Sequence, residues 1–160
     1  MQFRGILRAL AAARIDFIVI RGIGAVLRGA PIVTRDLDLV HGRGLENRRR
    51  LVAVLATMRA CYREPLPERY VPTVEDLASP LTHLLATDLG DLDLLGTTAG
   101  LDYEDLLPFA PQLELESDVS VRVLSLSRII ELKEGAARPK DLAQLPFLRD
   151  TLAEQRKRDG

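Results

Sequence analysis

Cysteine, histidine and long apolar runs are scarce in this chain. With one cysteine, Cys61, and two histidines, the sequence excludes an internal disulfide framework and a Cys/His zinc site. No run approaches the roughly 20 apolar residues that a membrane-spanning helix needs, and no apolar leader with a small-residue cleavage site opens the chain. The net charge is −1, so no overall basic character points to nucleic acid. We therefore expect a soluble, cytoplasmic protein with no membrane partner.

Several catalytic motifs are also absent. No Gly-Lys-Ser/Thr follows Gly24 or Gly29, which excludes a Walker phosphate loop, and the third glycine of a dinucleotide fingerprint is missing. Neither Gly-x-Ser-x-Gly nor His-Glu-x-x-His occurs, which argues against a serine hydrolase or a zincin. The 160 residues, 47% of them hydrophobic, suit one domain, which we place over 1–150 with a polar tail over 151–160.

The stretch over 16–24 reads as a buried strand followed by a glycine turn. The strand, Phe17 to Ile20, is apolar on both faces, as expected where both faces of a sheet are covered. Gly22 and Gly24 then allow a tight turn into a short helix that ends near Arg28. Because a helix start presents free backbone N–H groups, this turn is a potential phosphate site.

A second strand over 34–40 carries two carboxylates. Asp36 and Asp38 are two residues apart, so both are expected on one face of the strand, with Leu37 and Leu39 on the other. Two acids on one face repel each other unless a cation lies between them. Oxygen ligands of this kind suit Mg²⁺, which commonly uses one or two carboxylates together with substrate phosphates.

The rest of the chain alternates helices and strands, so we expect an α/β (α+β) fold with a small mixed sheet and helices chiefly on one face. Apolar spacing predicts helices over 3–14, 45–59 and 103–107 and strands over 81–86 and 91–95. It also predicts a hairpin over 113–123 and two C-terminal helices. An irregular, proline-rich connection occupies 64–80. We expect His41 at the surface and a structural role for His83.

A third carboxylate lies on the strand over 91–95. Asp91 and Asp93 share a face of this strand. Asp91 follows Gly90 and can be solvated at the turn, whereas Asp93 lies among leucines, where an unpaired charge is costly. We therefore select Asp93, with Asp91 as the alternative.

These motifs resemble the nucleotidyltransferase superfamily that includes DNA polymerase beta, and most of all its minimal and abortive-infection type IV toxin-like members. That family shows a strand, Gly-Gly or Gly-Ser, a short helix and then Asp-x-Asp, usually after Thr-Arg. Here Thr34-Arg35-Asp36-Leu37-Asp38 fits the second part, while Arg21 occupies the place of the first glycine and Gly22 that of the second. The resemblance implies the nucleotidyltransferase fold.

The resemblance extends to the C-terminal part of the chain. Related small enzymes often have a helix with a lysine, followed by Arg-x-Lys-Asp at the start of another helix. Lys133 and Arg138-Pro139-Lys140-Asp141 stand at the matching places, while Gln144 replaces a further Asp. The resemblance thus covers about 16–145.

By resemblance, the chain is a Mg²⁺- or Mn²⁺-dependent enzyme that moves a nucleoside monophosphate from an NTP to a hydroxyl group. Asp36 and Asp38 would hold the metal, and Asp93 would complete a second metal site and act as the base. The predicted nucleotide-binding residues are Gly22, Ile23, Thr34, Arg35, Lys133, Arg138, Lys140 and Asp141. The acceptor stays open between RNA such as tRNA, protein and a small molecule, and the possible partners include an antitoxin or a second copy of the chain.

Two rivals stay open at this point. The first is a non-catalytic binding partner or antitoxin that keeps the fold without turnover, which Arg21 and Gln144 favour. The second is a Mg²⁺-dependent phosphohydrolase that uses the same acids, although no water-activating histidine is obvious near them.

Overall fold

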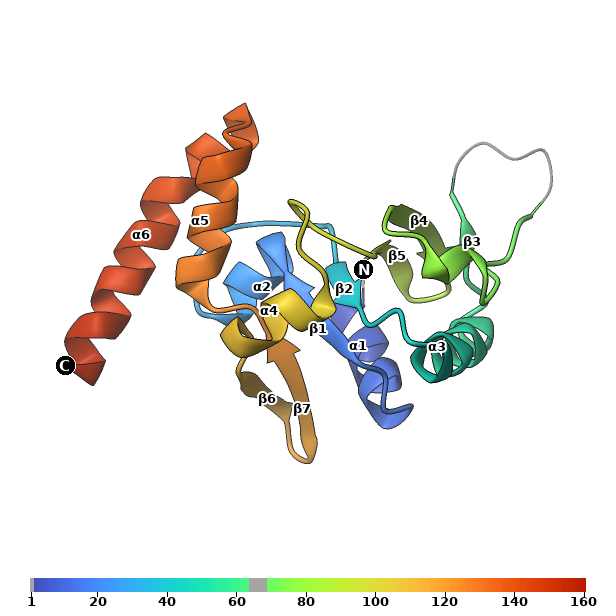
Figure 1. The fold of residues 1–160 in the computed structure, drawn as a ribbon. Coiled ribbons are helices and arrows are strands. Elements are labelled where there is room, and N and C mark those ends of the chain that lie inside the picture. Colours follow the sequence, from blue (N-terminus) through green and yellow to red (C-terminus); the bar gives the residue numbers. More distant parts are fainter. Residues whose placement is uncertain (1, 64–68) are drawn as a thin grey trace.

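The described residues form a seven-stranded mixed sheet at the centre of the molecule (Figure 1). The computed structural model of the chain describes residues 2–63 and 69–160. The strands are β1 (Phe17–Ile20), β2 (Asp38–His41), β3 (Cys61–Tyr62), β4 (Thr82–Thr87), β5 (Gly90–Leu95), β6 (Gln112–Glu116) and β7 (Val119–Val123). Their order in the sheet is β3-β4-β5-β2-β1-β7-β6. The predicted mixed sheet is therefore confirmed. Part of the predicted proline-rich connection, 64–68, lies outside the described residues.

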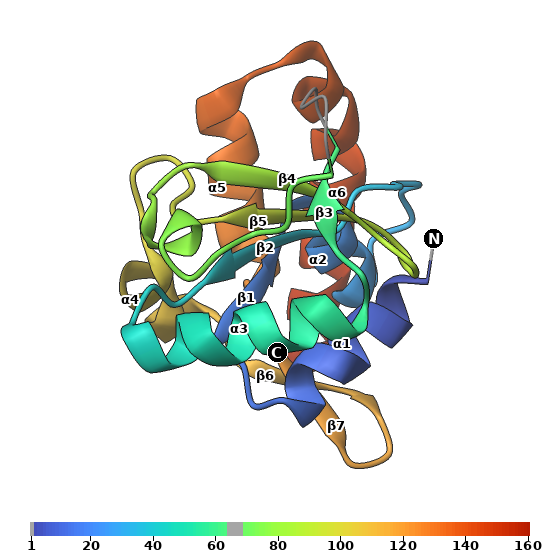
Figure 2. The same cartoon turned by 90° about the vertical axis from the view of Figure 1, so that its right-hand side faces the viewer.

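Helices cover both faces of this sheet, not chiefly one as predicted. They are α1 (Phe3–Ala12), α2 (Arg21–Leu27), α3 (Leu45–Thr57), α4 (Tyr103–Leu106), α5 (Leu126–Ala136) and α6 (Pro139–Asp159), with short 3₁₀ turns at Asp76–Ala78 and Leu107–Phe109. Figure 2 shows α1 and α3 on one side of the strands and α5 and α6 on the other. No helix in the described ranges is long and apolar enough to cross a membrane.

Two apolar clusters hold these layers together. Ile6, Leu7 and Leu10 of α1 belong to the first cluster, with Leu51 and Leu55 of α3, and pack under the sheet. The second lies on the opposite face and contains the following buried side chains of β1, β2, α5 and α6: Ile18, Ile20, Val40, Ile129, Ile130, Leu145 and Leu148. Strand β1 contributes to both clusters because its successive side chains point to opposite faces. The predicted burial of β1 on both faces is therefore confirmed.

Strand β2 lies between β1 and β5 and is shorter than predicted. It pairs antiparallel with β1, with Ile20 opposite Asp38, and parallel with β5, with Asp38 beside Asp93. The ladder begins only at Asp38, so Asp36 lies in the segment before the strand and its side chain is exposed. Asp36 therefore lies outside the strand, because β1 offers no pairing residue beyond Ile20, after which α2 begins. The predicted alternation is kept: Asp36 and Asp38 line one pocket, and Leu37 and Leu39 both belong to the first apolar cluster.

Helix α2 follows β1 directly, without the predicted glycine turn. Arg21 makes the change of direction with φ +57°, and Ile20 before it is extended. At Gly22 the need for glycine is steric, because a Cβ there would lie 2.6 Å from the hydroxyl oxygen of Thr34. Gly22 therefore lets the segment before β2 approach the start of α2.

One further feature differs from the sequence-based expectations. His41 is fully buried in the central strand rather than at the surface. The polar residues at the end of the chain continue α6 as far as Asp159, and the Gln155 side-chain amide donates to the Arg28 carbonyl. His83, for which a structural role is expected, is buried and contacts the Tyr62 hydroxyl at 2.8 Å through Nδ1.

Candidate active site

The register between β2 and β5 places two carboxylates side by side. Asp38 and Asp93 are neighbours in the parallel ladder, and the Asp93 amide donates to the Leu37 carbonyl at 2.9 Å. The Asp38 and Asp93 side chains are 6% and 17% exposed, whereas that of Asp91 is 60% exposed. Asp93 is thus much more buried than Asp91, in keeping with the apolar neighbours of Asp93.

Asp36 reaches the same region from the segment before β2. Its backbone amide donates to the Thr34 hydroxyl oxygen at 3.4 Å. Thr34 in turn lies against Gly22, with no room for a Cβ between them. The Thr34 side chain therefore connects the start of α2 with the backbone of Asp36.

A pocket of about 240 Å³ opens at this point. Its lining residues come from α2, the 34–38 segment, β5, α5 and α6: Arg21, Gly22, Thr34, Asp36, Asp38, Asp93, Lys133, Arg138, Lys140, Asp141 and Gln144. Two predicted residues are not among the described residues of this lining. Ile23 is buried in the core, and Arg35 is exposed. The other predicted residues meet in one pocket, although they come from opposite ends of the chain.

On the acidic side of the pocket, burial and neighbouring carboxylates disfavour the ionised form of Asp38. The pKa of Asp38 is raised to about 7, mainly by burial and also by the neighbouring carboxylates of Asp93 and Asp36, against the opposing effect of Arg21. The ionised form of Asp38 is therefore poorly compensated by the protein alone. A bound cation would remove this penalty.

The basic side of the pocket is built on a buried ion pair between α5 and α6. The Lys133 ammonium group lies 3.5 Å from the Asp141 carboxylate and donates to the Gln144 side-chain oxygen at 2.8 Å. Arg138 donates to the other Asp141 oxygen at 2.7 Å. The hydrogen bond from Arg138 lowers the pKa of Asp141, while burial lowers that of Lys133. Asp141 thus holds the Lys133 and Arg138 side chains at the pocket wall, and Gln144 accepts a hydrogen bond from Lys133.

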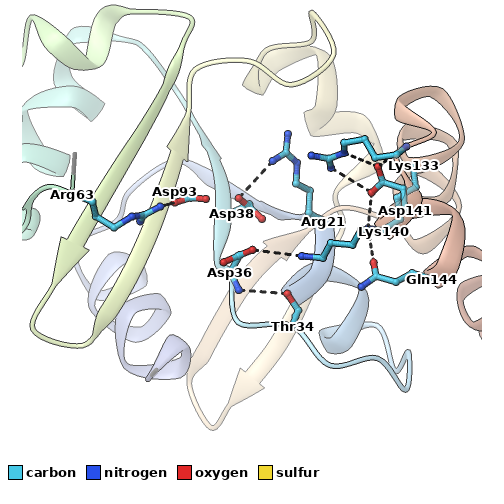
Figure 3. Close-up of polar contacts among 11 residues, drawn as sticks. Arg21, Thr34, Asp36, Asp38, Arg63, Asp93, Lys133, Lys140, Asp141 and Gln144 are labelled. Atoms are coloured by element: carbon cyan, nitrogen blue, oxygen red, sulfur yellow. Dashed lines mark hydrogen bonds and ion pairs between the residues drawn. The ribbon is translucent and has the colours of Figure 1, made fainter. Parts of the chain in front are cut away.

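Each of the three carboxylates faces a basic side chain (Figure 3). Arg21 lies 3.7 Å from Asp38, and Lys140 lies 3.7 Å from Asp36. Arg63 makes a shorter contact, with its Nη2 2.7 Å from Asp93 Oδ1. Sequence reasoning missed Arg63, because only the pairing of β3 with β4 brings this residue near β5. No local motif around Arg63 indicates that proximity.

A larger cavity of about 540 Å³ adjoins the pocket between α5, the α5–α6 connection and the loop at 98–99. The two cavities share four residues: Arg21, Lys133, Arg138 and Asp141. The larger one is lined mainly by apolar atoms, with Ile129 and Leu132 among its walls. A ligand with a charged part and a less polar part can therefore span both cavities.

The carboxylates fit a hard divalent cation that shares its coordination with a substrate. Within 2–63 and 69–160, no three His, Cys, Asp or Glu side chains are close enough together to hold a metal ion by themselves. Asp38 is buried beside other acids, and Asp36 is exposed at the mouth of the same pocket. Mg²⁺ commonly binds through one or two carboxylates and completes its octahedron with substrate phosphates and water. The donor set matches that mode of binding.

Comparisons with known proteins bear on the fold. No protein-family model matches the chain, and no curated protein matches it by sequence. Among solved structures, a proposed nucleotidyltransferase from Thermotoga maritima superposes with a TM-score of 0.58 at 17% identity, over 95% of this chain and 91% of its own. ANT(2″)-Ia in complex with adenylyl-2″-tobramycin gives a TM-score of 0.57 at 18% identity, over 96% and 89%. The solution structure of the same antibiotic-resistance factor gives 0.55 at 17%, over 98% and 90%. The chain therefore has the nucleotidyltransferase fold.

Proposed function

We propose that this chain, which has the fold of the nucleotidyltransferases, transfers a nucleoside monophosphate from an NTP to a hydroxyl group and releases pyrophosphate. One observation carries the proposal. Three carboxylates, Asp36, Asp38 and Asp93, and a set of basic side chains line opposite sides of one small pocket. Phosphoryl transfer depends mainly on positioning and charge stabilisation, and this arrangement offers both.

The triphosphate would lie between the two sides of the pocket. Lys133, Arg138 and Lys140 line the pocket together with the carboxylates and would neutralise phosphate oxygens. Lys133 and Arg138 are held by Asp141, so little side-chain entropy is lost when a phosphate binds. The nucleoside would occupy the adjoining cavity of about 540 Å³, which shares these two residues.

Asp36 and Asp38 would hold Mg²⁺ or Mn²⁺ against the phosphates. When bound, the ion would neutralise charge on the oxygens of the triphosphate and on those of the leaving pyrophosphate. The buried Asp38 is suited to this role because its ionised form lacks full compensation from the protein. Both residues would bind the ion more tightly with an NTP present than without it.

Asp93 would serve as the base for the acceptor. It lies beside Asp38 on the adjacent strand, so a hydroxyl directed at the α-phosphate would pass close to its carboxylate. The hydroxyl oxygen would bond to the α-phosphorus as its proton moves to Asp93. The bond from the α-phosphorus to the bridging oxygen would break, and pyrophosphate would leave toward Lys133, Arg138 and Lys140.

The acceptor would be a hydroxyl on RNA, protein or a small molecule. The structure of ANT(2″)-Ia holds adenylyl-2″-tobramycin, which supports a small-molecule acceptor for an enzyme of this fold. The resemblance to toxin-like members supports tRNA or protein instead, with an antitoxin as partner. Both groups of acceptors require the same transfer step in the pocket.

The test is transfer of label from each of the four NTPs in the presence of Mg²⁺. NTPs labelled at the α-phosphate are incubated with the protein and with RNA, cell protein or hydroxyl-bearing small molecules in turn. We expect the label to move to one acceptor class and transfer to cease when EDTA removes the ion. Release of orthophosphate from γ-labelled NTP, without transfer, would instead support a phosphohydrolase.

A matched pair of variants separates the pocket from the rest of the surface. Asp36→Asn removes a carboxylate of the pocket, and Asp159→Asn makes the same chemical change at the exposed end of α6. We expect the first to lose transfer and the second to keep it. If the protein binds NTPs but shows no transfer and no hydrolysis with any of them, the result would favour a non-catalytic partner.

A further inference from the structure

Arg63 lies in line with the carboxylates of the pocket, although it follows a strand at the far edge of the sheet. Its backbone amide donates to the Leu84 carbonyl at 3.0 Å and so extends the pairing of β3 with β4. Leu84 is opposite Asp93 in β5, and Asp93 is beside Asp38 in β2. Residues paired in this way point to the same face of a sheet. Arg63 therefore reaches over Leu84 toward Asp93.

The guanidinium group of Arg63 is fixed by partners on two strands. Nη2 donates to Asp93 Oδ1 at 2.7 Å, and Nη1 donates to the Leu85 carbonyl at 2.7 Å. Nε lies 3.8 Å from the carboxylate of Asp91. Two short hydrogen bonds from one planar group restrict both its position and its rotation. Arg63 is thus a built part of the site rather than a loosely placed surface side chain.

The other two cations facing the carboxylates are held much less firmly. The contacts of Arg21 with Asp38 and of Lys140 with Asp36 are both 3.7 Å, longer than a hydrogen bond. Their side chains are 40% and 65% exposed, against 25% for Arg63. Incoming phosphates can therefore draw Arg21 and Lys140 away from their carboxylates, while Arg63 keeps its contact with Asp93.

We infer that Arg63 takes the place of a second divalent ion at Asp93, so that the pocket binds one exchangeable metal ion at Asp36 and Asp38. This inference rests on the proposed function. The positive charge of Arg63 is already within hydrogen-bonding distance of Asp93 Oδ1, where a second metal ion would otherwise compensate the carboxylate. A divalent ion at that oxygen would have to displace a guanidinium that the Leu85 carbonyl also holds. Arg63 is a positioning residue, and Asp93 retains its second oxygen for the acceptor proton.

The experiment counts bound Mn²⁺ per chain with a non-hydrolysable NTP analogue at saturation, by calorimetry and by electron paramagnetic resonance. We expect one ion in the natural protein. Arg63→Met keeps the length of the side chain but removes its charge, and we expect it to bind a second ion. Arg50→Met makes the same change at an exposed arginine of α3, on the side of the sheet opposite α5 and α6, and we expect one ion.

A second variant and a second measurement cover the case in which Arg63→Met does not fold. Arg63→Lys keeps a cation near Asp93, and we expect it to bind one ion. In crystals of the natural protein with Mn²⁺ and the analogue, anomalous scattering should give one peak, at Asp36 and Asp38. A further peak coordinated by Asp93 would overturn the inference by itself.

The outcomes separate this inference from the function on which it rests. Two ions in the natural protein, or one ion in folded Arg63→Met, would refute the role of Arg63 and leave nucleotidyl transfer standing. No bound Mn²⁺ with the analogue in any variant would refute the proposed function and the inference together. One ion in the natural protein and two in Arg63→Met would support both.

Discussion

Strand β2 buries an ionisable residue on each of its two faces, and the surroundings of these two residues differ. Asp38 points into the pocket, where Arg21, Asp93 and Asp36 surround it. His41, three residues later, points to the opposite face, where it is fully buried and its Nδ1 contacts the Gly42 carbonyl at 3.1 Å. Within the described part of the chain, its Nε2 has no hydrogen-bond partner.

The difference shows which burial serves a ligand and which serves the fold. Around Asp38 the protein assembles charged groups of both signs at the wall of a cavity, so a charged ligand can complete the set. Around His41 the neighbours are His83, Arg43 and Arg48, which all disfavour a charged imidazole, as burial itself does. Asp38 is thus suited to bind a charged ligand in its ionised form, whereas His41 is stable only as a neutral residue of the core.

The strongest test of this contrast replaces each residue by an uncharged residue of similar shape. Asp38→Asn should lower the proposed nucleotidyl transfer by about three orders of magnitude, because it removes a carboxylate proposed to hold the metal ion, a contribution of several kcal/mol. Its melting temperature should stay the same or rise, since a poorly compensated buried charge is removed. His41→Leu should keep the transfer rate within a few-fold.

Transfer rates and calorimetric melting curves of the two variants provide the measurement. If Asp38→Asn loses its cooperative melting transition, Asp38 has a structural role and the contrast with His41 is wrong. If His41→Leu loses transfer while it remains folded, the closed face of β2 takes part in the reaction.

The next largest effect is the dependence of stability on pH. Burial lowers the pKa of His41 to about 4, below its ordinary value of 6.5. Between these values the unfolded chain binds more protons than the folded one, so stability is complete above pH 6.5 and falls as the pH drops toward 4. We expect the free energy of unfolding at pH 5 to be about 2 kcal/mol lower than at pH 8 from this residue.

Urea denaturation at several pH values checks this expectation. His83, which faces His41 and has its pKa lowered by burial, adds in the same direction. Asp38 acts in the opposite direction, because its pKa, raised to about 7, lets the folded chain keep a proton that the unfolded chain loses above about pH 4. The comparison is therefore between two proteins: from pH 8 to pH 5, the natural protein should lose about 2 kcal/mol more unfolding free energy than His41→Leu does. An unchanged slope in His41→Leu would show that His41 is neutral in both states or exposed in solution.

The smallest effect concerns packing beside the pocket. Gly22→Ala places a Cβ 2.6 Å from the Thr34 hydroxyl oxygen, and Gly24→Ala places one 3.3 Å from a terminal methyl group of Ile129. We expect the first to lower stability by about 1–3 kcal/mol through overpacking. The second should lower stability less, because its contacts, the Ile129 methyl group and the Val19 carbonyl oxygen, both lie at 3.3 Å and alanine favours the helix. If Gly22→Ala and Gly24→Ala had equal melting temperatures, the 34–36 segment would be able to shift away from α2 without loss of stability.

Local patterns were sufficient to predict much of this molecule from its sequence. The alternation of apolar and acidic residues in β5 indicated Asp93, and the apolar run in β1 indicated a strand buried on both faces. Periodicity and spacing within one element are reliable guides in these two cases. Lys133 and Arg138, which the family resemblance indicated, line the same pocket as Asp93.

Features that depend on pairing between distant strands were not predictable in this way. His41 is the last residue of β2, and only the central position of β2 in the sheet explains its burial. Arg63 meets Asp93 because two antiparallel pairings in succession align their strands. Asp36 was assigned to β2 from its spacing, but the strand begins where the pairing with β1 begins, at Asp38. The register between strands, which sequence patterns do not specify, decides all three.

The backbone at Arg21 has a consequence for anyone who redesigns this protein for stability. Left-handed φ values are unfavourable for residues with a Cβ by roughly 1 kcal/mol, and glycine adopts them freely. A stability-directed algorithm or a consensus substitution would therefore place glycine at this position. That change would remove the cation that lies beside Asp38 and lines both cavities. A thermostable version with Arg21→Gly would keep the fold but lose this cation. Engineering for stability should therefore leave Arg21 unchanged.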